Sequence, residues 1–322
     1  MIGFLLGGEF TGDAIHRQGR ANFGLAVIQG LVTAVLVSVG LWVAGVEGEL
    51  ALMLGGVAVA TAPAATLAVV QEQRARGPFA RRLISVVAVD DVVALTLFGF
   101  LATVATWSVA SERTGLVRDS IWEIVGAVLI GLVLGLPAAA LTGRLRPGTP
   151  TREEAYAAML LCAGLAVALD VSYLLAAVVM GATVANRAKH HAVTFREVER
   201  VEWPALVIFF VLAGASLELS QLAEIGWLGA GYVGLRTLGK VAGCELGGRV
   251  ARMPRNESRW LGLAMLPQAG VAIGLALLAS DRFPEVGEQL LAVVIAATVL
   301  FELVGPILTK LALERVGEAR PA

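Results

Sequence analysis

The stretch Ser85–Thr96, SVVAVDDVVALT, places two neighbouring carboxylates, Asp90 and Asp91, inside an apolar run. The run extends from Leu83 to about Thr106, and about 20 apolar residues at about 1.5 Å each cross a bilayer. Asp91 lies nine residues beyond Arg82, about 13 Å deep and close to the membrane midplane. Two charges at this depth are costly and repel each other, so they require water, a counter-charge or a cation. The stretch therefore predicts an ion or proton site within the membrane.

The composition is typical of a membrane protein. Mean hydropathy is +0.78, and only 16% of residues are charged, whereas soluble domains carry about 25%. The 37 glycines suit packed transmembrane helices. A formal net charge of −1 gives no indication of a nucleic-acid partner. Cys162 and Cys244 lie in apolar runs, which favours packing residues over a disulfide or a metal pair.

Ten apolar stretches predict about ten full transmembrane helices. They cover residues 22–45, 49–71, 83–107, 121–142, 155–169, 171–186, 204–220, 225–248, 258–280 and 287–311. The opening Met1–Phe10 is too short to cross a bilayer and is expected to be the end of a helix whose beginning is missing. Asp170 is expected to be an interfacial turn between two short spans that form a hairpin. His190 and His191 are expected to be solvated loop residues rather than a pH sensor, and Val193–Glu202 a short interfacial helix.

The basic residues alternate between the two sides of the predicted spans. Of the 25 Lys and Arg residues, 20 lie in one set of alternate connections and three in the other. Cytoplasmic loops carry the excess of Lys and Arg. The pattern predicts an integral, multi-pass membrane protein whose C-terminus is cytoplasmic. The two remaining basic residues, Arg236 and Lys240, lie inside a span.

Lys240 is nine residues from Arg249 and therefore about 13 Å deep, the depth of the two acids. A buried ammonium is costly without a partner, so a pair with Asp90 or Asp91 is expected. The alternative is that Lys240 extends to a membrane surface. Arg236 lies one turn away on the same helix face and also needs an acid. Glu302 is the candidate for this structural ion pair and is not expected to be a cation ligand.

Two spans, 49–71 and 258–280, are predicted to be broken near their middles, because each contains a proline there. Proline removes a backbone donor and clashes with the preceding turn. Irregular backbone at membrane depth is found where it is buried in protein or lines a cavity. The alternative is two ordinary proline kinks. The residues that mark the breaks are Pro63, Pro267, Gln268 and Gly270.

The two broken spans are the middle members of two sets of three. Residues 22–107 begin on the basic side and residues 225–313 on the other side, so the sets have opposite topology. Inverted repeats with broken helices in corresponding positions are typical of secondary transporters, and the breaks indicate the substrate site. We expect one transmembrane domain over residues 1–322, with these sets as core repeats and scaffold helices over residues 121–220.

These residues resemble the monovalent cation/proton antiporter family, the sodium/proton exchangers. The matching segments are FLLGGEF near the start, TAPAATLAVVQE at 61–72, SVVAVDDVVAL at 85–95, RTLGKVAG at 236–243, LPQAGVAIGLAL at 266–277 and ELVGPILTKLAL at 302–313. They occur in order over essentially the whole chain. The double aspartate with an intramembrane lysine is similar to the electrogenic bacterial branch.

The resemblance implies an all-α polytopic membrane protein in which two discontinuous helices cross within inverted three-helix repeats. It implies a transporter rather than an enzyme, without a cofactor, that exchanges a monovalent cation for protons by alternating access. Sodium is the expected cation, and a homodimer in the bacterial cell membrane the expected assembly. By this resemblance Asp91 binds the cation transiently and exchanges protons, Asp90 pairs with Lys240, and Thr61 lines the crossing.

The chain departs from the family pattern at Ala62, where relatives often have a polar residue. Relatives also have at least one further helix before the point where this chain begins. The alternatives are a potassium/proton antiporter of the same family, a sodium-coupled organic-solute symporter of similar fold, and an inactive truncated relative. A glutathione-gated potassium system is disfavoured, because no G-x-G-x-x-G motif follows a predicted strand.

Overall fold

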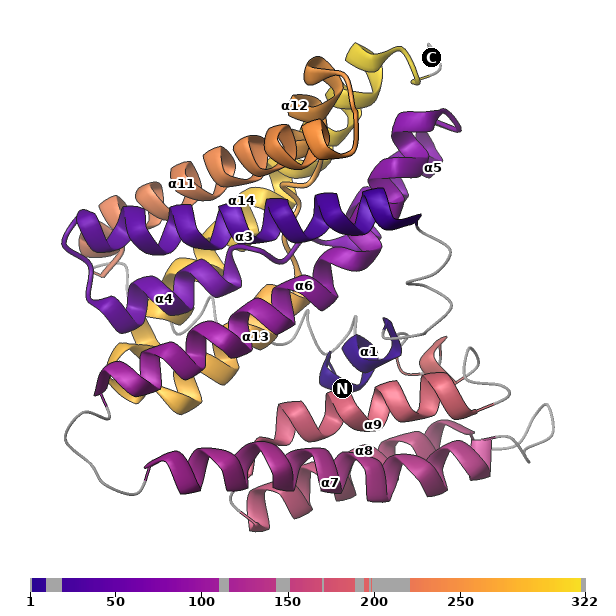
Figure 1. The fold of residues 1–322 in the computed structure, drawn as a ribbon, viewed down its shortest axis with the longest axis vertical. Coiled ribbons are helices and arrows are strands. Elements are labelled where there is room, and N and C mark those ends of the chain that lie inside the picture. The colour runs from indigo at the N-terminus through magenta and orange to yellow at the C-terminus, as the bar shows by residue number, and fades with distance from the viewer. Residues whose placement is uncertain are drawn as a thin grey trace. The chain divides into compact units, whose positions relative to one another are not determined.

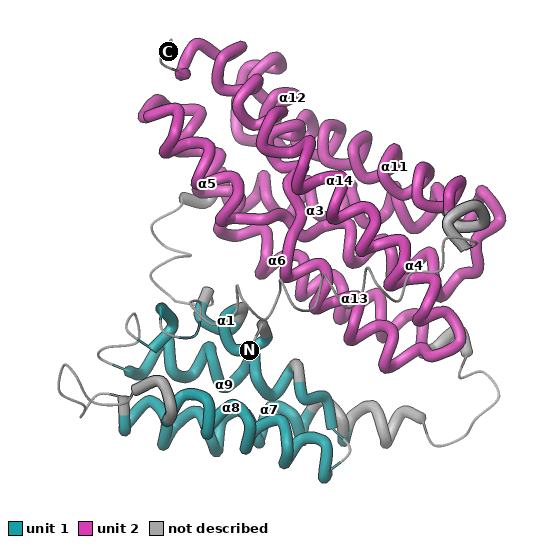
Figure 2. Tube along the Cα trace, turned by 180° about the vertical axis from the view of Figure 1, so that it is seen from behind, with its two compact units in different colours: residues 1–15, 109–212 teal, residues 16–108, 213–322 magenta. Residues whose placement is uncertain are grey.

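The computed structural model of the chain describes residues 2–9, 19–109, 116–142, 151–169, 171–188, 194–196, 198 and 221–319. Over these residues the regular structure is helical, as Figure 1 shows. The chain divides into two compact units, drawn in different colours in Figure 2. Unit 1 comprises residues 1–15 and 109–212, and unit 2 comprises residues 16–108 and 213–322. Both predicted core repeats therefore belong to unit 2.

Unit 2 contains the two predicted sets of three spans. The first set consists of α3 (Gly19–Val43), the half helices α4 (Gly48–Val57) and α5 (Pro63–Glu72), and α6 (Pro78–Val109). The second set consists of α11 (Gln221–Val250), the half helices α12 (Arg255–Ala264) and α13 (Gly270–Arg282), and α14 (Pro284–Val316). The first helices of the two sets, α3 and α11, lie side by side (Figure 1). Each predicted span of this unit is thus one helix or a pair of half helices.

Three helical segments in the described part of the chain are long and apolar enough by themselves to cross a membrane. They are Ala21–Val43, Pro78–Thr106 and Pro284–Val316. The half helices are shorter, at 10 to 13 residues each. Only a pair of them, joined end to end, reaches the roughly 20 residues that a bilayer requires.

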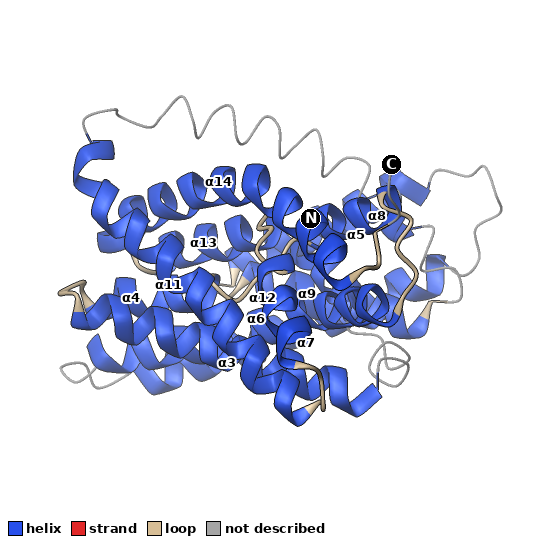
Figure 3. Cartoon of the chain, turned by 90° about the horizontal axis from the view of Figure 1, so that it is seen from above, coloured by secondary structure: helices blue, strands red, loops and turns tan. Residues whose placement is uncertain are grey.

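The first break has a local cause that differs from the one predicted. Helix α4 ends at Val57, and the chain is extended at Ala62, with φ −81° and ψ 105°. Pro63 then occupies the first turn of α5, where a missing N–H costs nothing and the fixed φ suits a helix. Pro63 therefore starts the second half helix rather than lying inside the break. In the second broken span, Pro267 does lie between the helices, and Gly270 starts α13; Figure 3 shows such connections as tan loops.

Glycines allow the backbones of α3 and α11 to touch. A Cβ added at Gly243 would lie 2.6 Å from Gln29 Cα, and one at Gly239 would lie 2.8 Å from Thr33 Cα. A third glycine, Gly247, continues the stripe at the same spacing. Small residues every four positions let membrane helices pack closely. The two repeats are therefore joined along this seam by backbone contact.

Gly305 on α14 makes an equally close contact with the second break. A Cβ at this position would lie 2.8 Å from the Cα, the Cγ and the nitrogen of Pro267. The backbone and the ring of a proline cannot move aside as a flexible side chain can. We therefore expect Gly305→Ala to lower the free energy of unfolding by about 1–3 kcal/mol, measured as a lower Tm in detergent.

A matched control for this change is Gly229→Ala on α11. Nothing lies within 4 Å of a Cβ at Gly229, and alanine is favoured over glycine in a helix by about 1 kcal/mol. The control should keep or raise the Tm. An unchanged Tm for Gly305→Ala would show that the contact with Pro267 is not tight.

The end of α14 is connected to the start of α6 by one carboxylate. Gly317 ends α14 with a left-handed φ of 80°. The Glu318 carboxylate accepts hydrogen bonds from Phe79 N at 2.8 Å and Ala80 N at 2.9 Å. These N–H groups belong to the first turn of α6, which has no intrahelical acceptors for them. A Cβ at Gly77 would overlap this carboxylate, so glycine there provides its space.

Removing this cap should loosen the first turn of α6. We expect Glu318→Ala to cost about 1 kcal/mol, the typical value of a capping interaction with a helix dipole, and to speed amide hydrogen exchange at Phe79 and Ala80. Glu314→Ala is the control, because Glu314 is an exposed acid one turn earlier on α14. Unchanged exchange at both amides in Glu318→Ala would contradict the capping role.

Unit 1 is a separate helical cluster. It contains α1 (Ile2–Glu9), α7 (Leu116–Thr142), α8 (Thr151–Ala168) and α9 (Tyr173–Arg187). Gly7 and Gly181 permit α1 and α9 to cross, because a Cβ at either would overlap the other helix's backbone. Helix α8 packs on α9, and Ser172 caps α9 by accepting a hydrogen bond from Leu175 N at 3.3 Å. The predicted hairpin of two short helices is present.

Some expectations fall outside the described residues. They concern the turn at Asp170, the pair His190 and His191, the span 204–220, and most of the interfacial helix at 193–202. In that last segment residues 194–196 and 198 are helical.

Candidate functional site

The two breaks contact each other inside unit 2. Ala62 N donates to Pro267 O at 2.8 Å, and Thr61 Oγ1 donates to Met265 O at 3.1 Å. Both contacts join residues more than 200 positions apart in sequence. The extended segments thus pair where the half helices end, which leaves carbonyl groups without intrahelical donors nearby.

Lys240 joins this crossing to the helix of the two acids. Its Nζ donates to Asp90 Oδ2 at 3.0 Å, to Thr61 Oγ1 at 2.8 Å and to the Val59 carbonyl oxygen. Lys240 and Asp90 are both 0% exposed. An ammonium has three N–H groups, so these three acceptors satisfy it. Lys240 does not extend to a surface, and a buried cation with a paired anion meets the condition for stable burial.

Asp90 is held on both of its oxygens. Lys240 contacts Oδ2, and the Nε2 of Gln29 on α3 donates to Oδ1. Gln29 is itself 0% exposed. Three helices, α3, α6 and α11, therefore each contribute one polar side chain to this cluster.

Asp91 follows on α6 and is 4% exposed. Successive residues on an α-helix point about 100° apart. Asp91 therefore faces a different direction from the contact between Asp90 and Lys240. Of the two acids that the sequence offered as partners for Lys240, the structure brings Asp90 to it.

Arg236 does not form the predicted ion pair with Glu302. Its Nε donates to Ala58 O at 3.0 Å, its Nη1 to Leu266 O at 2.8 Å and its Nη2 to Ala60 O at 2.8 Å. Both breaks thus bind one fully buried guanidinium. The physical reason is that helix C-termini carry partial negative charge and unpaired carbonyls, so they replace the expected carboxylate.

Glu302, the predicted partner of Arg236, lies on a face of α14 that points away from the guanidinium. The guanidinium carbon of Arg236 stacks over the Phe301 ring, 4.3 Å from its centroid. Glu302 is the next residue, so its side chain points about 100° away on the helix. Its Oε1 is buried and has no hydrogen-bond partner.

Polar residues recur every four positions along one face of α11. Tyr232, Arg236, Lys240 and Cys244 are each 0% exposed, as expected for one helix face. The Tyr232 hydroxyl accepts from Gln268 Nε2 at 3.1 Å, which places the predicted break residue Gln268 against α11. This face therefore contacts both breaks over most of its length.

Two residues of the site, Gln29 and Tyr232, were missed in the sequence. Gln29 is an amide in the middle of an apolar span, AVIQGLV, which is the same kind of signal as Lys240. Tyr232 precedes Arg236 by one helical turn. Both could have been found by following the polar residues of each span at helical spacing.

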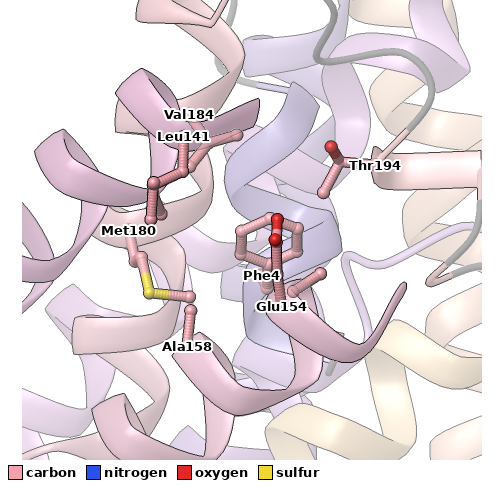
Figure 4. Close-up of a pocket in the computed structure, with 9 residues that line it drawn as sticks. Phe4, Leu141, Glu154, Ala158, Met180, Val184 and Thr194 are labelled. Atoms are coloured by element: carbon pink, nitrogen blue, oxygen red, sulfur yellow. The ribbon is translucent and has the colours of Figure 1, made fainter. Parts of the chain in front are cut away.

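No other group in the described ranges suggests a second centre of this kind. There, no three or more His, Cys, Asp or Glu side chains lie together as a metal site. A pocket in unit 1 is mostly apolar, with Glu154 and Thr194 as its polar lining residues (Figure 4). It contains none of the predicted site residues. A cation at Asp91 would be a transported substrate rather than a resident metal.

Comparisons with known proteins bear on the family and the fold of the chain. A family model described as "Sodium/hydrogen exchanger, transmembrane" matches residues 1–315. No curated protein matches in a sequence search.

Two solved structures of the sodium proton antiporter MjNhaP1 from Methanocaldococcus jannaschii are similar in fold. One, at pH 8, has a TM-score of 0.69 at 19% identity and covers 98% of this chain and 84% of that chain. The other, an electron-microscopy structure, has a TM-score of 0.64 at 18% identity, with 99% and 84% covered. At this identity the likeness concerns the fold, which is that of a polytopic membrane protein. The family model spans nearly the whole sequence, and the chain belongs to the sodium/hydrogen exchanger family.

Proposed function

We propose that the protein exchanges sodium for protons across the cell membrane, with Asp91 as the carrier of both ions. The observation that supports this most is the fully buried pair of Asp90 and Lys240, with Asp91 as the next residue on α6. Ionisable residues at membrane depth mark ion and proton pathways. The family of the chain supports cation/proton antiport in general, and these residues support the specific roles.

The formal charges around the crossing support a proton or a cation as the occupant of the site. Lys240 balances Asp90 at 3.0 Å. Arg236 binds carbonyls that follow α4 and α12, and each helix C-terminus carries about half a negative charge. The partial negative charges of these two helix C-termini together balance the positive charge of the guanidinium. Asp91 adds a second carboxylate beside the pair of Asp90 and Lys240, and a proton or a monovalent cation can bind to it.

This balance supports exchange rather than leak. With a proton or a cation on Asp91 the buried cluster is close to neutral, whereas the empty carboxylate adds a charge inside the membrane. Burying an uncompensated charge is strongly unfavourable. The occupied site therefore changes its accessibility more readily than the empty site, so each crossing carries one of the two ions.

The division of the chain supports alternating access by unit 2. Both repeats, both breaks and all residues of the cluster belong to this unit. We infer that unit 2 is the moving core and that unit 1, with the helices of residues 121–220, is the scaffold of a homodimer. The basic connections and the C-terminus are inferred to be cytoplasmic.

Reconstituted protein in liposomes with a trapped pH dye tests this function. Sodium added outside should drive protons out of acid-loaded vesicles, and the lumen should become alkaline. A response to potassium but not sodium would assign a potassium/proton antiporter instead. Proton movement that requires neither cation would overturn antiport. The absence of any proton movement would also overturn it and would favour a solute symporter or an inactive relative.

A further inference from the structure

The side chain of Gln29 has a second polar atom besides the nitrogen that contacts Asp90. A carboxamide has a donating end and an accepting end on one carbon. The Nε2 end donates to Asp90 Oδ1. The accepting atom, Oε1, is buried and has no hydrogen-bond partner. This oxygen lies within the width of one amide group from the Asp90 carboxylate.

The position of Gln29 is fixed by its backbone rather than by its side chain alone. Its Cα lies against Gly243, where a Cβ would approach to 2.6 Å. Its carbonyl oxygen accepts from Thr33 Oγ1 at 2.7 Å. Gly243 is three residues beyond Lys240 on α11, so the same contact places Gln29 beside the ion pair. The amide therefore has little freedom to withdraw from Asp90.

The contact with Asp90 also decides which end of the amide is left over. An ionised carboxylate only accepts hydrogen bonds, so the amide nitrogen faces it. The carbonyl oxygen must then point elsewhere in the buried cluster. Leaving such an acceptor unsatisfied costs about 1–3 kcal/mol, and buried polar atoms are normally satisfied by protein, water or an ion.

A carbonyl oxygen is a suitable ligand for a dehydrated alkali cation. Rings of carbonyl oxygens replace the hydration shell of such ions in channels. The first break does not supply a side-chain ligand at position 62, which is alanine. An additional neutral oxygen from α3 would complete a site that otherwise depends on the acids and Thr61.

We infer that Gln29 is a further ligand of the transported cation, contributing its Oε1 while its Nε2 holds Asp90. This inference rests on the proposed exchange function. It assigns to α3, outside both broken helices, a direct part in cation affinity. The ligand is a monovalent metal cation, and sodium is the probe.

The test measures the sodium concentration that gives half-maximal proton movement in proteoliposomes. Gln29→Leu keeps the approximate side-chain size and removes both the oxygen and the donor to Asp90, and it should raise this concentration about tenfold, the lower range for loss of a residue supporting an ion site. The maximal rate of Gln29→Leu should fall less than its affinity.

Ser38→Ala is the matched control. Ser38 lies on the same helix, is 7% exposed, and also has a buried oxygen without a hydrogen-bond partner. It should leave half-saturation unchanged, which separates cation binding from general loss of a buried polar group. If Gln29→Leu does not fold, Gln29→Asn replaces it, because it shortens the amide by one methylene and withdraws the oxygen.

The outcomes separate this inference from the proposed function. If the unmodified protein shows no sodium-driven proton movement, the proposed function fails. If it does, but Gln29→Leu or Gln29→Asn saturates at the same sodium concentration, Oε1 is satisfied by water alone and only the ligand role of Gln29 is overturned. An equal shift in Ser38→Ala would also overturn it.

Discussion

Asp91→Asn is expected to reduce sodium-driven proton movement to the level of protein-free liposomes. The amide has nearly the size of the carboxyl group, but it does not release and rebind a proton as an acid does and it carries no charge. The substituted site can then not alternate between its two occupants. The protein should still fold, because the Asp90 to Lys240 pair, with its hydrogen bonds, is untouched.

Two further variants serve as controls for Asp91→Asn. Asp281→Asn removes an exposed acid at the end of α13 and should leave transport unchanged. Asp90→Asn removes the partner of Lys240 and should lower both stability and rate, without the complete loss expected at position 91. Exchange at the unmodified rate in Asp91→Asn would end its role as carrier. Complete loss only in Asp90→Asn would exchange the two roles.

Arg236→Met is expected to have the largest effect on stability. It leaves three carbonyl oxygens without their donor, each at a cost of about 1–3 kcal/mol, and it removes the stacking on Phe301. Relaxation and water entry recover part of this, so we expect a loss of about 4 kcal/mol. The measurement is thermal unfolding in detergent, followed by size-exclusion chromatography of the heated samples.

The chemistry of the guanidinium predicts the result of a milder change. Arg236→Lys keeps the charge but lacks the planar fork that reaches three acceptors, so it should be intermediate. Lys310→Met removes an exposed cation from α14 and should have no effect. If Arg236→Met unfolds at the temperature of the unmodified protein, the arginine does not hold the two breaks together.

The family, the helical membrane fold and the two broken spans could be predicted from the sequence. Hydropathy reports span length, and a proline in the middle of a span favours a break there, although Pro306 lies inside the continuous helix α14; both signals are local. Counting from the flanking arginines also predicts that the acids and Lys240 lie at matching positions along their spans, and Asp90 and Lys240 do meet. The choice of Asp90 as the lysine's partner comes only from the family resemblance, because neighbouring residues have nearly equal depth and differ in helix rotation; the structure shows that pair.

The partner of Arg236 could not be predicted for a different reason. From residue types alone an acidic side chain is the expected partner of a buried arginine, and Glu302 is the acid at a suitable depth. The acceptors are backbone carbonyls of Ala58, Ala60 and Leu266, which become available only because two helices stop there. Whether these carbonyls are free to accept depends on the tertiary structure, and it cannot be recognised from the residue types.

The glycine seam between α3 and α11 limits how the protein can move. With Gly239 and Gly243 in backbone contact with the facing helix, no side chains at these points can change rotamer to widen a passage. Sliding would bring a Cβ-bearing residue into the space of a glycine. We therefore expect the two inverted halves of unit 2 to move together as one rigid body, with the path for ions along the outer faces of that body rather than between α3 and α11.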